Sequence, residues 1–189
     1  MSSSRTHSLA LTPHPAAGRL DAVREIEVRV SRDPNGGLAL KYTLRGDPGR
    51  LAIPPARAPQ RADELWRHTC FEAFIAPGAG PTYLEFNFSP SGEWASYEFA
   101  KYREQRRLEQ LPTGAVAPLP DPSSRTLRTG EDLTLEADVA LECMRGEKPV
   151  RIALASVVED ASGQLWYWAL RHPPGRPDFH HPDGFALQI

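Results

Sequence analysis

The sequence predicts an all-β fold, an antiparallel β-sandwich of the jelly-roll kind with about nine to eleven strands and at most one short surface helix. Short runs of alternating apolar and polar residues recur along the chain, separated by turn-forming residues, which is the pattern of sandwiches and barrels. The 14 glycines and 19 prolines among the 189 residues exceed the usual share of about 12%. A chain of this length forms one domain, residues 1–189, with a substantial core.

The first third of the chain predicts a short strand, a hairpin and a long loop. Ser8–Leu11 is a candidate strand that two prolines end. Ile26–Val30 and Leu38–Leu44 alternate apolar and polar residues on either side of the sequence DPNGG, in which Asn and Gly tolerate a positive φ. We therefore expect these two runs to pair as a hairpin. Gly46–Arg61 is rich in proline and glycine and predicts a long loop, and long loops in compact domains often border binding sites. A short strand at Leu51–Ile53 within this loop is an open alternative.

The stretch from Trp66 to Phe99 predicts three consecutive strands joined by two turns. Side chains alternate between the two faces of a strand, so each of these strands has an apolar face and a face with groups able to hold a ligand. The apolar positions, which we expect to face the core, are Phe71, Ala73 and Ile75, then Leu84, Phe86 and Phe88, then Ala95, Tyr97 and Phe99. The opposite positions are Trp66, His68, Cys70 and Glu72, then Tyr83, Glu85 and Asn87, then Trp94, Ser96 and Glu98.

The next part of the chain predicts two connections and three strands. Lys101–Leu111 carries charges at nearly every position and is read as a short surface helix or a polar loop. Pro112–Arg125 is a proline-rich connection without a core-forming pattern. Leu133–Leu141 alternates apolar and polar residues as a half-exposed strand does. Arg151–Val158 is continuously apolar, which suits a strand covered on both faces, and the turn EDASG joins it to Gln164–Leu170.

The end of the chain is rich in aromatic residues. Trp166 and Trp168 lie on the same side of their strand. They pack in the core or, alternatively, form a stacking platform beside a site. A last short strand is expected at Phe185–Ile189.

Charge and cysteine content exclude several classes of protein. A net charge of −2 gives no overall field that would draw the chain to nucleic acid or anionic lipid. The two cysteines do not make a disulfide framework, and Cys70 is expected to be a free buried thiol. The N-terminus lacks the apolar segment of a secretory signal, and no run reaches the ~20 apolar residues of a membrane span, so we expect a soluble cytoplasmic protein. No catalytic motif of high specificity is present.

The polar faces of the three central strands form the first candidate site. Adjacent strands lie about 4.8 Å apart, so Glu72, Glu85 and Asn87 can converge on a ligand as wide as a sugar ring. Carboxylates and amides hydrogen-bond to hydroxyl groups, and tryptophan faces pack on the apolar side of a pyranose. The alternative is that the carboxylates pair with arginines of neighbouring strands and serve only the scaffold. The candidate ligand-binding residues of this face are Trp66, His68, Glu72, Glu85, Asn87 and Trp94.

A loop near the C-terminus forms the second candidate site. Histidines and carboxylates close together in a loop are the side chains that bind metal ions. Adjacent histidines on an extended chain point in opposite directions, so His180 and His181 are not expected to bind one ion together. The alternative is that these side chains lock the loop through hydrogen bonds to its backbone. The residues concerned are His172, Asp178, His180, His181 and Asp183. The sequence assigns no particular metal or cofactor.

Two segments of the chain resemble the bacterial DOMON-like proteins, which are grouped with the family 9 carbohydrate-binding-module-like superfamily. They are LWRHTCFEAFI with YLEFNFSPSGEWASYEF, and YWALRHPPGRPDFHHPDGFAL. In that superfamily a Trp precedes a strand with an acidic, an aromatic and an aliphatic residue, here Glu72, Phe74 and Ile75, and the next strand ends in an Asn/Ser-Pro-x-Gly turn, here at Ser89–Gly92. The resemblance implies a β-sandwich whose pocketed sheet binds sugars in some relatives and haem in others. It places Trp66, Glu72, Glu85, Asn87 and Trp94 near that pocket.

These observations together favour a non-catalytic domain that binds a carbohydrate or a similar small polar molecule on the central strands. The alternatives are a metal-dependent hydrolase or lyase that uses His172, His180 or His181, and a haem-binding module. Neither nucleic acid nor a membrane is an expected partner, and the sequence does not indicate an oligomeric state.

Overall fold

A computed structural model of the chain describes residues 6–32, 35–106, 119, 121–141 and 149–189, and it confirms the all-β sandwich. These residues hold twelve strands, every pairing of which is antiparallel. The first sheet contains β1 (Thr6–Pro13), β2 (Val23–Arg32), β3 (Gly37–Gly46), β9 (Asp132–Ala140) and β8 (Ser123–Thr129). The second contains β7 (Glu104–Gln105), β6 (Trp94–Lys101), β5 (Tyr83–Phe88), β4 (Cys70–Pro77), β10 (Val150–Glu159), β11 (Leu165–Ala169) and β12 (Leu187–Gln188).

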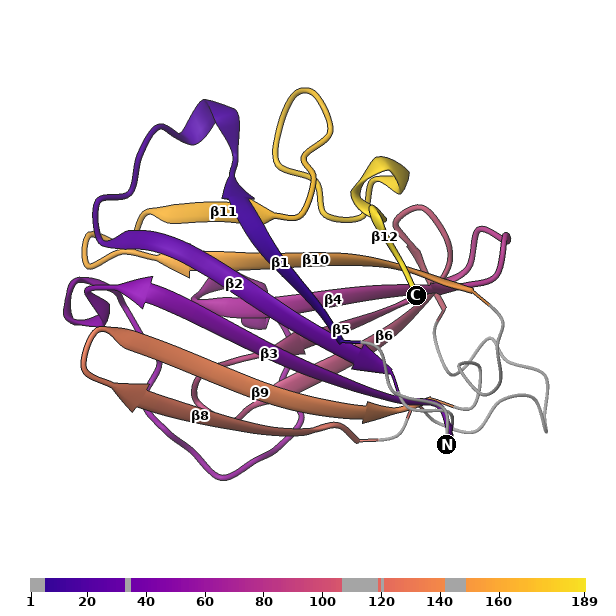
Figure 1. The fold of residues 1–189 in the computed structure, drawn as a ribbon, viewed down its shortest axis with the longest axis horizontal. Helices are drawn as coiled ribbons and strands as arrows, with labels where there is room; N and C mark the ends of the chain where they lie inside the picture. Colours follow the sequence, from indigo (N-terminus) through magenta and orange to yellow (C-terminus); the bar gives the residue numbers. More distant parts are fainter. Residues whose placement is uncertain (1–5, 33–34, 107–118, 120, 142–148) are drawn as a thin grey trace.

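Strand β1 belongs to both sheets and joins them. Its residues Thr6 to Leu11 pair with β2, while Thr12 and Pro13 pair with β11. Figure 1 shows β1 running obliquely between β11 and β2, with the first sheet in front of β4, β5 and β6. The continuous strand order β7-β6-β5-β4-β10-β11-β1-β2-β3-β9-β8 is therefore folded over on itself into two layers.

The main hydrophobic core fills the space between the two layers. Phe71, Phe86 and Phe88 of the second sheet are fully buried in one cluster with the first-sheet side chains. Tyr42 of β3 crosses the core: its ring lies 5.0 Å from that of Phe71, and its hydroxyl donates a 2.8 Å hydrogen bond to the backbone carbonyl of Glu72. Since burying each large apolar side chain contributes about 1.5–3 kcal/mol, this core between the sheets provides most of the stability of the fold.

The predicted hairpins are confirmed. β2 pairs with β3, β10 pairs with β11, and β4, β5 and β6 form a three-stranded meander. Part of the DPNGG turn, residues 33–34, lies outside the described residues. At Leu51 the structure has an isolated bridge to Asp160 in place of a short strand. The predicted last strand is shortened to β12, which pairs with β10.

Between β6 and β9 the structure decides one open alternative and adds a strand. Of the short helix or polar loop expected from Lys101, residues 101–106 form a tight turn into β7, and residues 107–111 lie outside the described residues. The proline-rich connection ends at β8, which the sequence pattern did not indicate. β8 is an edge strand with mostly exposed side chains, so it has no apolar alternation to reveal it. No helix among the described residues is long and apolar enough to cross a membrane.

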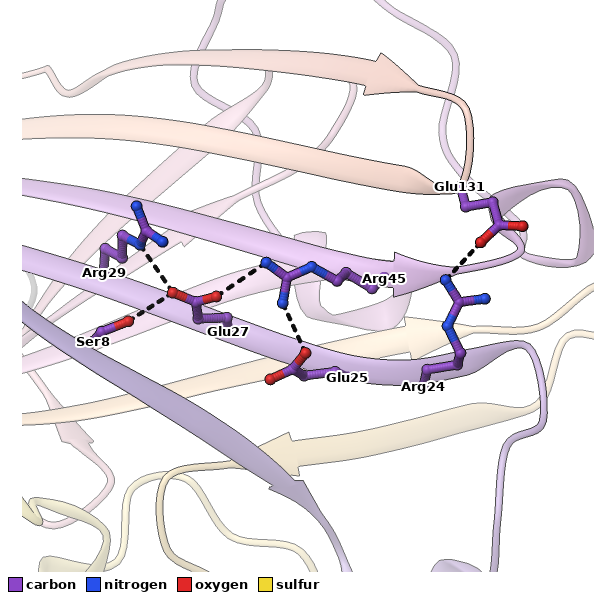
Figure 2. A network of polar contacts seen from close by, with 7 residues as sticks. All are labelled: Ser8, Arg24, Glu25, Glu27, Arg29, Arg45 and Glu131. Carbon is purple, nitrogen blue, oxygen red and sulfur yellow. Dashed lines mark hydrogen bonds and ion pairs between the residues drawn. The ribbon is translucent and has the colours of Figure 1, made fainter.

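The outer face of the first sheet is a solvated network of ion pairs. Ser8 Oγ and Arg29 Nε donate hydrogen bonds of 2.6 and 2.9 Å to Glu27 Oε1, and Arg45 Nη2 donates one of 3.1 Å to Glu27 Oε2. These donors, Ser8 first, lower the pKa of Glu27 to about 2. Figure 2 shows the network, which contains Ser8, Arg24, Glu25, Glu27, Arg29, Arg45 and Glu131.

Candidate functional site

A cavity of about 790 Å³ lies on the outer face of the second sheet, away from the main core. Its floor is built on β4, β5, β6, β10 and β11, beside a second apolar cluster that includes Phe74, Tyr83 and Phe99. The loop before β4, the turn between β6 and β7, and the loop after β11 form its walls. The lining residues are Arg61, Asp63, Glu64, Trp66, Glu72, Glu85, Tyr97, Phe99, Arg103, Gln105, Val157, Tyr167, Arg176, Pro177, Phe179 and His180.

Strand register brings the polar side chains of the floor together. Glu72 of β4 lies directly opposite Asn87 of β5, and Glu85 lies two residues before Asn87 on the same face. Glu85 is in turn opposite Tyr97 of β6. Opposite residues in an antiparallel pair point to the same face, so these four side chains share the outer face of the sheet. The predicted convergence of Glu72, Glu85 and Asn87 is therefore present in the structure.

The two floor carboxyls are buried without an arginine or lysine partner. Glu72 is 3% exposed and Glu85 is 5% exposed. Among the described residues no arginine or lysine lies within ion-pair distance of either, so the scaffold ion-pair alternative does not describe this site. Asn87 Nδ2 donates a 2.8 Å hydrogen bond to Glu85 Oε1, whereas Glu72 Oε1 and Asn87 Oδ1 are buried without a hydrogen-bond partner.

Burial controls the titration of both floor carboxyls. It raises the pKa of Glu72 well above the usual range, and the nearby charge of Glu85 raises it further. It also raises the pKa of Glu85 to about 7, although the hydrogen bond from Asn87 and the charge of Arg103 oppose the shift. A carboxyl with a raised pKa can act as donor or acceptor near neutral pH, which suits a ligand that offers both.

His180 forms part of the wall and ties the C-terminal loop to the sheet. Its Nδ1 lies 2.9 Å from the Tyr83 hydroxyl, and its ring packs edge-on against Phe74 and Phe99 at 5.2 and 5.0 Å. Burial lowers the pKa of His180 to about 4, so the imidazole is neutral at pH 7. Its Nε2 lies 3.8 Å from Glu85 Oε2, which is beyond hydrogen-bond distance.

Asp178 anchors the same loop to the turn between β6 and β7. Arg103 Nη2 donates a 2.8 Å hydrogen bond to Asp178 Oδ1, and the Tyr102 hydroxyl donates another to Asp178 Oδ2. Asp178 Oδ1 also accepts a 3.1 Å bond from the backbone N–H of His180. The sequence prediction that this loop is locked by side-chain hydrogen bonds to its backbone is thus confirmed for Asp178.

Aromatic rings and charged groups alternate around the rim. Trp66 is 45% exposed, and the guanidinium of Arg67 lies 5.4 Å from the centre of its ring. Tyr97 donates a 2.8 Å hydrogen bond to Asp63, while Arg61 lies 5.5 Å from the centre of the Tyr97 ring. Planar faces beside hydrogen-bonding groups are therefore available to a ligand at the mouth of the cavity.

Backbone strain is concentrated at this cavity. Among the described residues, Glu64 and Arg103 are the two non-glycine residues with a positive φ, at 61° and 57°. Both line the cavity. Left-handed non-glycine residues cost free energy and gather where the surrounding structure must place particular groups.

The structure places some of the predicted residues elsewhere. His68 is exposed and follows a short 3-10 turn, Leu65–Arg67, with its Nδ1 2.7 Å from Glu159 Oε2. Since β4 begins only at Cys70, the alternation of that strand does not extend back to His68. Trp66 also precedes β4, so the strand's alternation does not place it either. It lies in the 3-10 turn Leu65–Arg67, which puts its side chain at the rim of the cavity. Cys70 is a buried free thiol, as predicted.

Trp94 faces the main core, so its assignment to the binding face was wrong. It lies opposite Phe88 in the register and is 7% exposed. Because Phe88 faces the core, its partner must do so too, and Tyr97 and Phe99 take the cavity face of β6 instead. Pairing Phe88 with Trp94 across the SPSG turn is the signal that could have revealed this from the sequence.

The loop histidines do not come together as the metal-binding alternative requires. His172 Nε2 lies 2.8 Å from the backbone carbonyl of Thr12, and its ring contacts that of His14. His181 Nδ1 accepts a hydrogen bond from the backbone N–H of Asp183. The part of the chain that the structure describes contains no group of three or more His, Cys, Asp or Glu side chains that could hold a metal ion.

Several cavity residues were not anticipated. Tyr167 lines the cavity, whereas Trp168 and Trp166 on either side of it pack with the main core, which supports core packing for the two tryptophans. The alternation of β11 could have shown this. The remaining lining residues lie in loops and turns or, for Gln105, in the two-residue strand β7, so no alternation pointed to them; they are Arg61, Asp63, Glu64, Arg103, Gln105, Arg176, Pro177 and Phe179.

Comparisons with known proteins support the fold. No protein-family model and no curated protein matches the sequence. The structure is similar to a Bacteroides uniformis protein described as a candidate carbohydrate-binding protein, with a TM-score of 0.65 and 13% identity over 96% of this chain and 84% of that one. It is also similar to a family 9 carbohydrate-binding module from Caldicellulosiruptor kristjanssonii in complex with glucose, with a TM-score of 0.53 and 9% identity over 80% of this chain and 69% of that one.

A module of the same family and organism in complex with cellotriose gives a TM-score of 0.51 and 10% identity, over 80% of this chain and 67% of that one. The chain therefore has the fold of family 9 carbohydrate-binding modules, as the sequence resemblance implied. The DOMON-like part of that resemblance stays a prediction.

Proposed function

We propose that the cavity on the second sheet binds a carbohydrate. The observation that carries the proposal is one cavity of about 790 Å³ in which buried hydrogen-bonding groups form the floor and aromatic rings form the wall. Small-molecule sites have volumes of about 300–1,000 Å³ and combine many apolar contacts with a few placed polar groups. The likeness of fold to modules in complex with glucose and cellotriose supports the same class of ligand.

A pyranose presents two surfaces that match this arrangement. Its hydroxyl groups both donate and accept hydrogen bonds, and Glu85 and Asn87 on the floor can do the same in return. Its C–H faces are apolar and pack on aromatic rings, which Trp66, Tyr97 and Tyr167 provide. Guanidinium groups that line the cavity, such as that of Arg103, offer further donors to sugar hydroxyls.

Replacement of Trp66 by alanine tests the proposal. We expect Trp66→Ala to weaken binding of glucose or cellotriose by about tenfold, which equals ~1.4 kcal/mol, because the exposed ring face is lost. The melting temperature without ligand should hardly change, because Trp66 is 45% exposed. Isothermal titration calorimetry of the full chain gives the affinities, and a melting curve checks the fold.

Leu127→Ala is the matched control, since Leu127 is a similarly exposed apolar residue, 48%, on β8 of the other sheet. It should alter neither affinity nor melting temperature. Failure of a panel of mono- and oligosaccharides to bind the wild-type chain would contradict the proposal.

A further inference from the structure

We propose that the saccharide bound in this cavity carries a primary amine, as a 2-amino-2-deoxy sugar does, and that the paired carboxyls of the floor hold its ammonium group. The inference rests on the carbohydrate-binding function proposed above and narrows its ligand class. It starts from hydrogen-bond acceptors on the floor that lack donors.

Three acceptor atoms of the floor have no hydrogen-bond donor among the described residues. Glu72 Oε1 and Asn87 Oδ1 are buried and unpartnered, and the nearest basic nitrogen to Glu85 Oε2 is His180 Nε2 at 3.8 Å. Leaving buried polar atoms unpaired costs free energy. A hydroxyl group brings one hydrogen, whereas an ammonium group brings three, so an ammonium group matches the acceptors in number.

The charge of the floor points to the same ligand group. Two carboxyls share one face of adjacent strands, and the neighbouring imidazole of His180 is neutral at pH 7 because burial lowers its pKa. Arg103, the cation that acts on Glu85, is already ion-paired with Asp178 at 2.8 Å. With no cation of its own, the pair therefore holds a proton near neutral pH, on Glu72 above all. An ammonium group would replace the proton and form charge-assisted hydrogen bonds, which are stronger than neutral ones.

The surroundings of the floor favour an organic cation over a metal ion. Calcium takes about six to eight oxygen ligands and magnesium requires a near-ideal octahedron. The space above Glu72 and Glu85 is instead bordered by the rings of Tyr97, Phe99 and Phe179. Ring carbons provide no ligands for a hard metal ion. They suit the C–H face of a sugar, and the face of an aromatic ring attracts an ammonium group.

Calorimetric titration of the full chain with D-glucosamine, D-glucose and N-acetyl-D-glucosamine tests the inference. At one pH near neutrality, D-glucosamine should bind at least about tenfold more tightly than the other two, because only it offers a charged donor. Titrations in two buffers of different ionisation enthalpy should show that protons leave the floor when the amine binds. Equal or weaker binding of D-glucosamine while D-glucose binds would overturn this inference and leave the carbohydrate function standing. Absence of binding by all three and by cellotriose would reject both.

Charge-removing variants locate the effect. Glu72→Gln and Glu85→Gln keep the side-chain shape but remove the carboxylate charge. The ratio of D-glucosamine to D-glucose affinity should therefore fall to about one in each variant, because the charge-assisted hydrogen bonds are lost. Glu136→Gln is the control: Glu136 is paired with Lys41 and Arg125 on the first sheet, and its ratio should equal that of the wild type. A calcium-induced rise in melting temperature that also abolishes the preference for D-glucosamine would assign the floor to a metal ion and contradict the inference.

Discussion

Two glutamates on opposite sheets of this molecule titrate in opposite directions because their neighbours differ. Glu27 accepts hydrogen bonds from Ser8, Arg29 and Arg45, which lower its pKa to about 2 from an ordinary value of 4.5. Glu85 is buried on the cavity floor with one hydrogen bond, from Asn87, and no arginine or lysine ion pair among the described residues, and its pKa rises to about 7. The fold therefore favours the anion of the first carboxyl and the neutral acid of the second.

Opposite effects of pH on stability follow for the two glutamine variants. Glu27→Gln should lower the melting temperature at neutral pH, with the difference shrinking as the pH falls from about 4.5 toward 2, where the wild-type carboxylate is protonated in the fold as well. Glu85→Gln should raise the melting temperature above pH 7, with the difference vanishing as the pH falls from about 7 to 4.5, because burying the ionised form is what costs stability there. Melting curves across this pH range measure both. A Glu85→Gln protein that is less stable than wild type above pH 7 would mean that a cation holds the carboxylate.

At the scale of elements, the loop after β11 is positioned by a few contacts to the turn between β6 and β7. Asp178 accepts two of them, from Tyr102 and Arg103, and it also accepts a hydrogen bond from the backbone N–H of His180 within the loop itself. The loop brings Phe179 and His180 over the cavity. Its place, and with it one wall of the cavity, therefore depends on this carboxylate together with the contact between His180 and Tyr83.

Removal of that carboxylate should loosen the loop without unfolding the sheet. In Asp178→Ala, hydrogen exchange should accelerate at residues 176–181 and remain slow in β4 and β5, since local opening involves only the region whose contacts are lost. Sugar affinity should fall by about tenfold because the wall is no longer pre-organised. Asp183→Ala, an exposed aspartate of the same loop, should leave both quantities unchanged. Exchange that accelerates throughout the second sheet would contradict a local role.

The strands most visible in the sequence were those with a strong pattern on at least one face. β2, β3, β9 and β10 were expected close to where they lie, and the alternation of β4 and β5 placed Glu72 and Glu85 correctly. β6 was found but its faces were exchanged, because aromatic residues occupy both of them and only the pairing of Trp94 with Phe88 decides. β8 was missed because an exposed edge strand needs no apolar residues.

The polar floor of the cavity could be predicted, but of its rim and wall only Trp66 and His180 were named, for a physical reason. Floor residues follow the period of two of a strand, whereas wall residues such as Arg61, Arg103 and Phe179 depend on how separate loops meet in space. The fold and the polar floor were therefore within reach of the sequence. The rest of the rim, including its strained residue Glu64, required the three-dimensional arrangement.

At the scale of the whole molecule, the two sheets are coupled beneath the cavity. The Tyr42 hydroxyl of the first sheet reaches across the core to the backbone of Glu72, the residue whose side chain lies on the floor. Strand β1 adds a covalent link, since it pairs with both β2 and β11. Unfolding of one sheet should therefore unfold the other.

Tyr42→Phe measures this coupling. The change removes a buried hydrogen bond and leaves the ring, so the free energy of unfolding should fall by about 1–2 kcal/mol in urea denaturation, as one transition with an unchanged slope. Tyr167→Phe, whose hydroxyl makes no hydrogen bond among the described residues, should leave the free energy of unfolding unchanged. Two separate transitions in the Tyr42→Phe protein would show that the sheets unfold independently.

The placement of the cavity on the second sheet alone has a practical consequence. None of the cavity-lining residues belongs to a strand of the first sheet. Lys41 of β3 has a side chain that is 45% exposed in the charged network of that sheet. Attachment to a chip or resin through this amine would fix the molecule by its first sheet and leave the mouth of the cavity open, so a sensor built on the proposed saccharide binding should keep its solution affinity when it is immobilised.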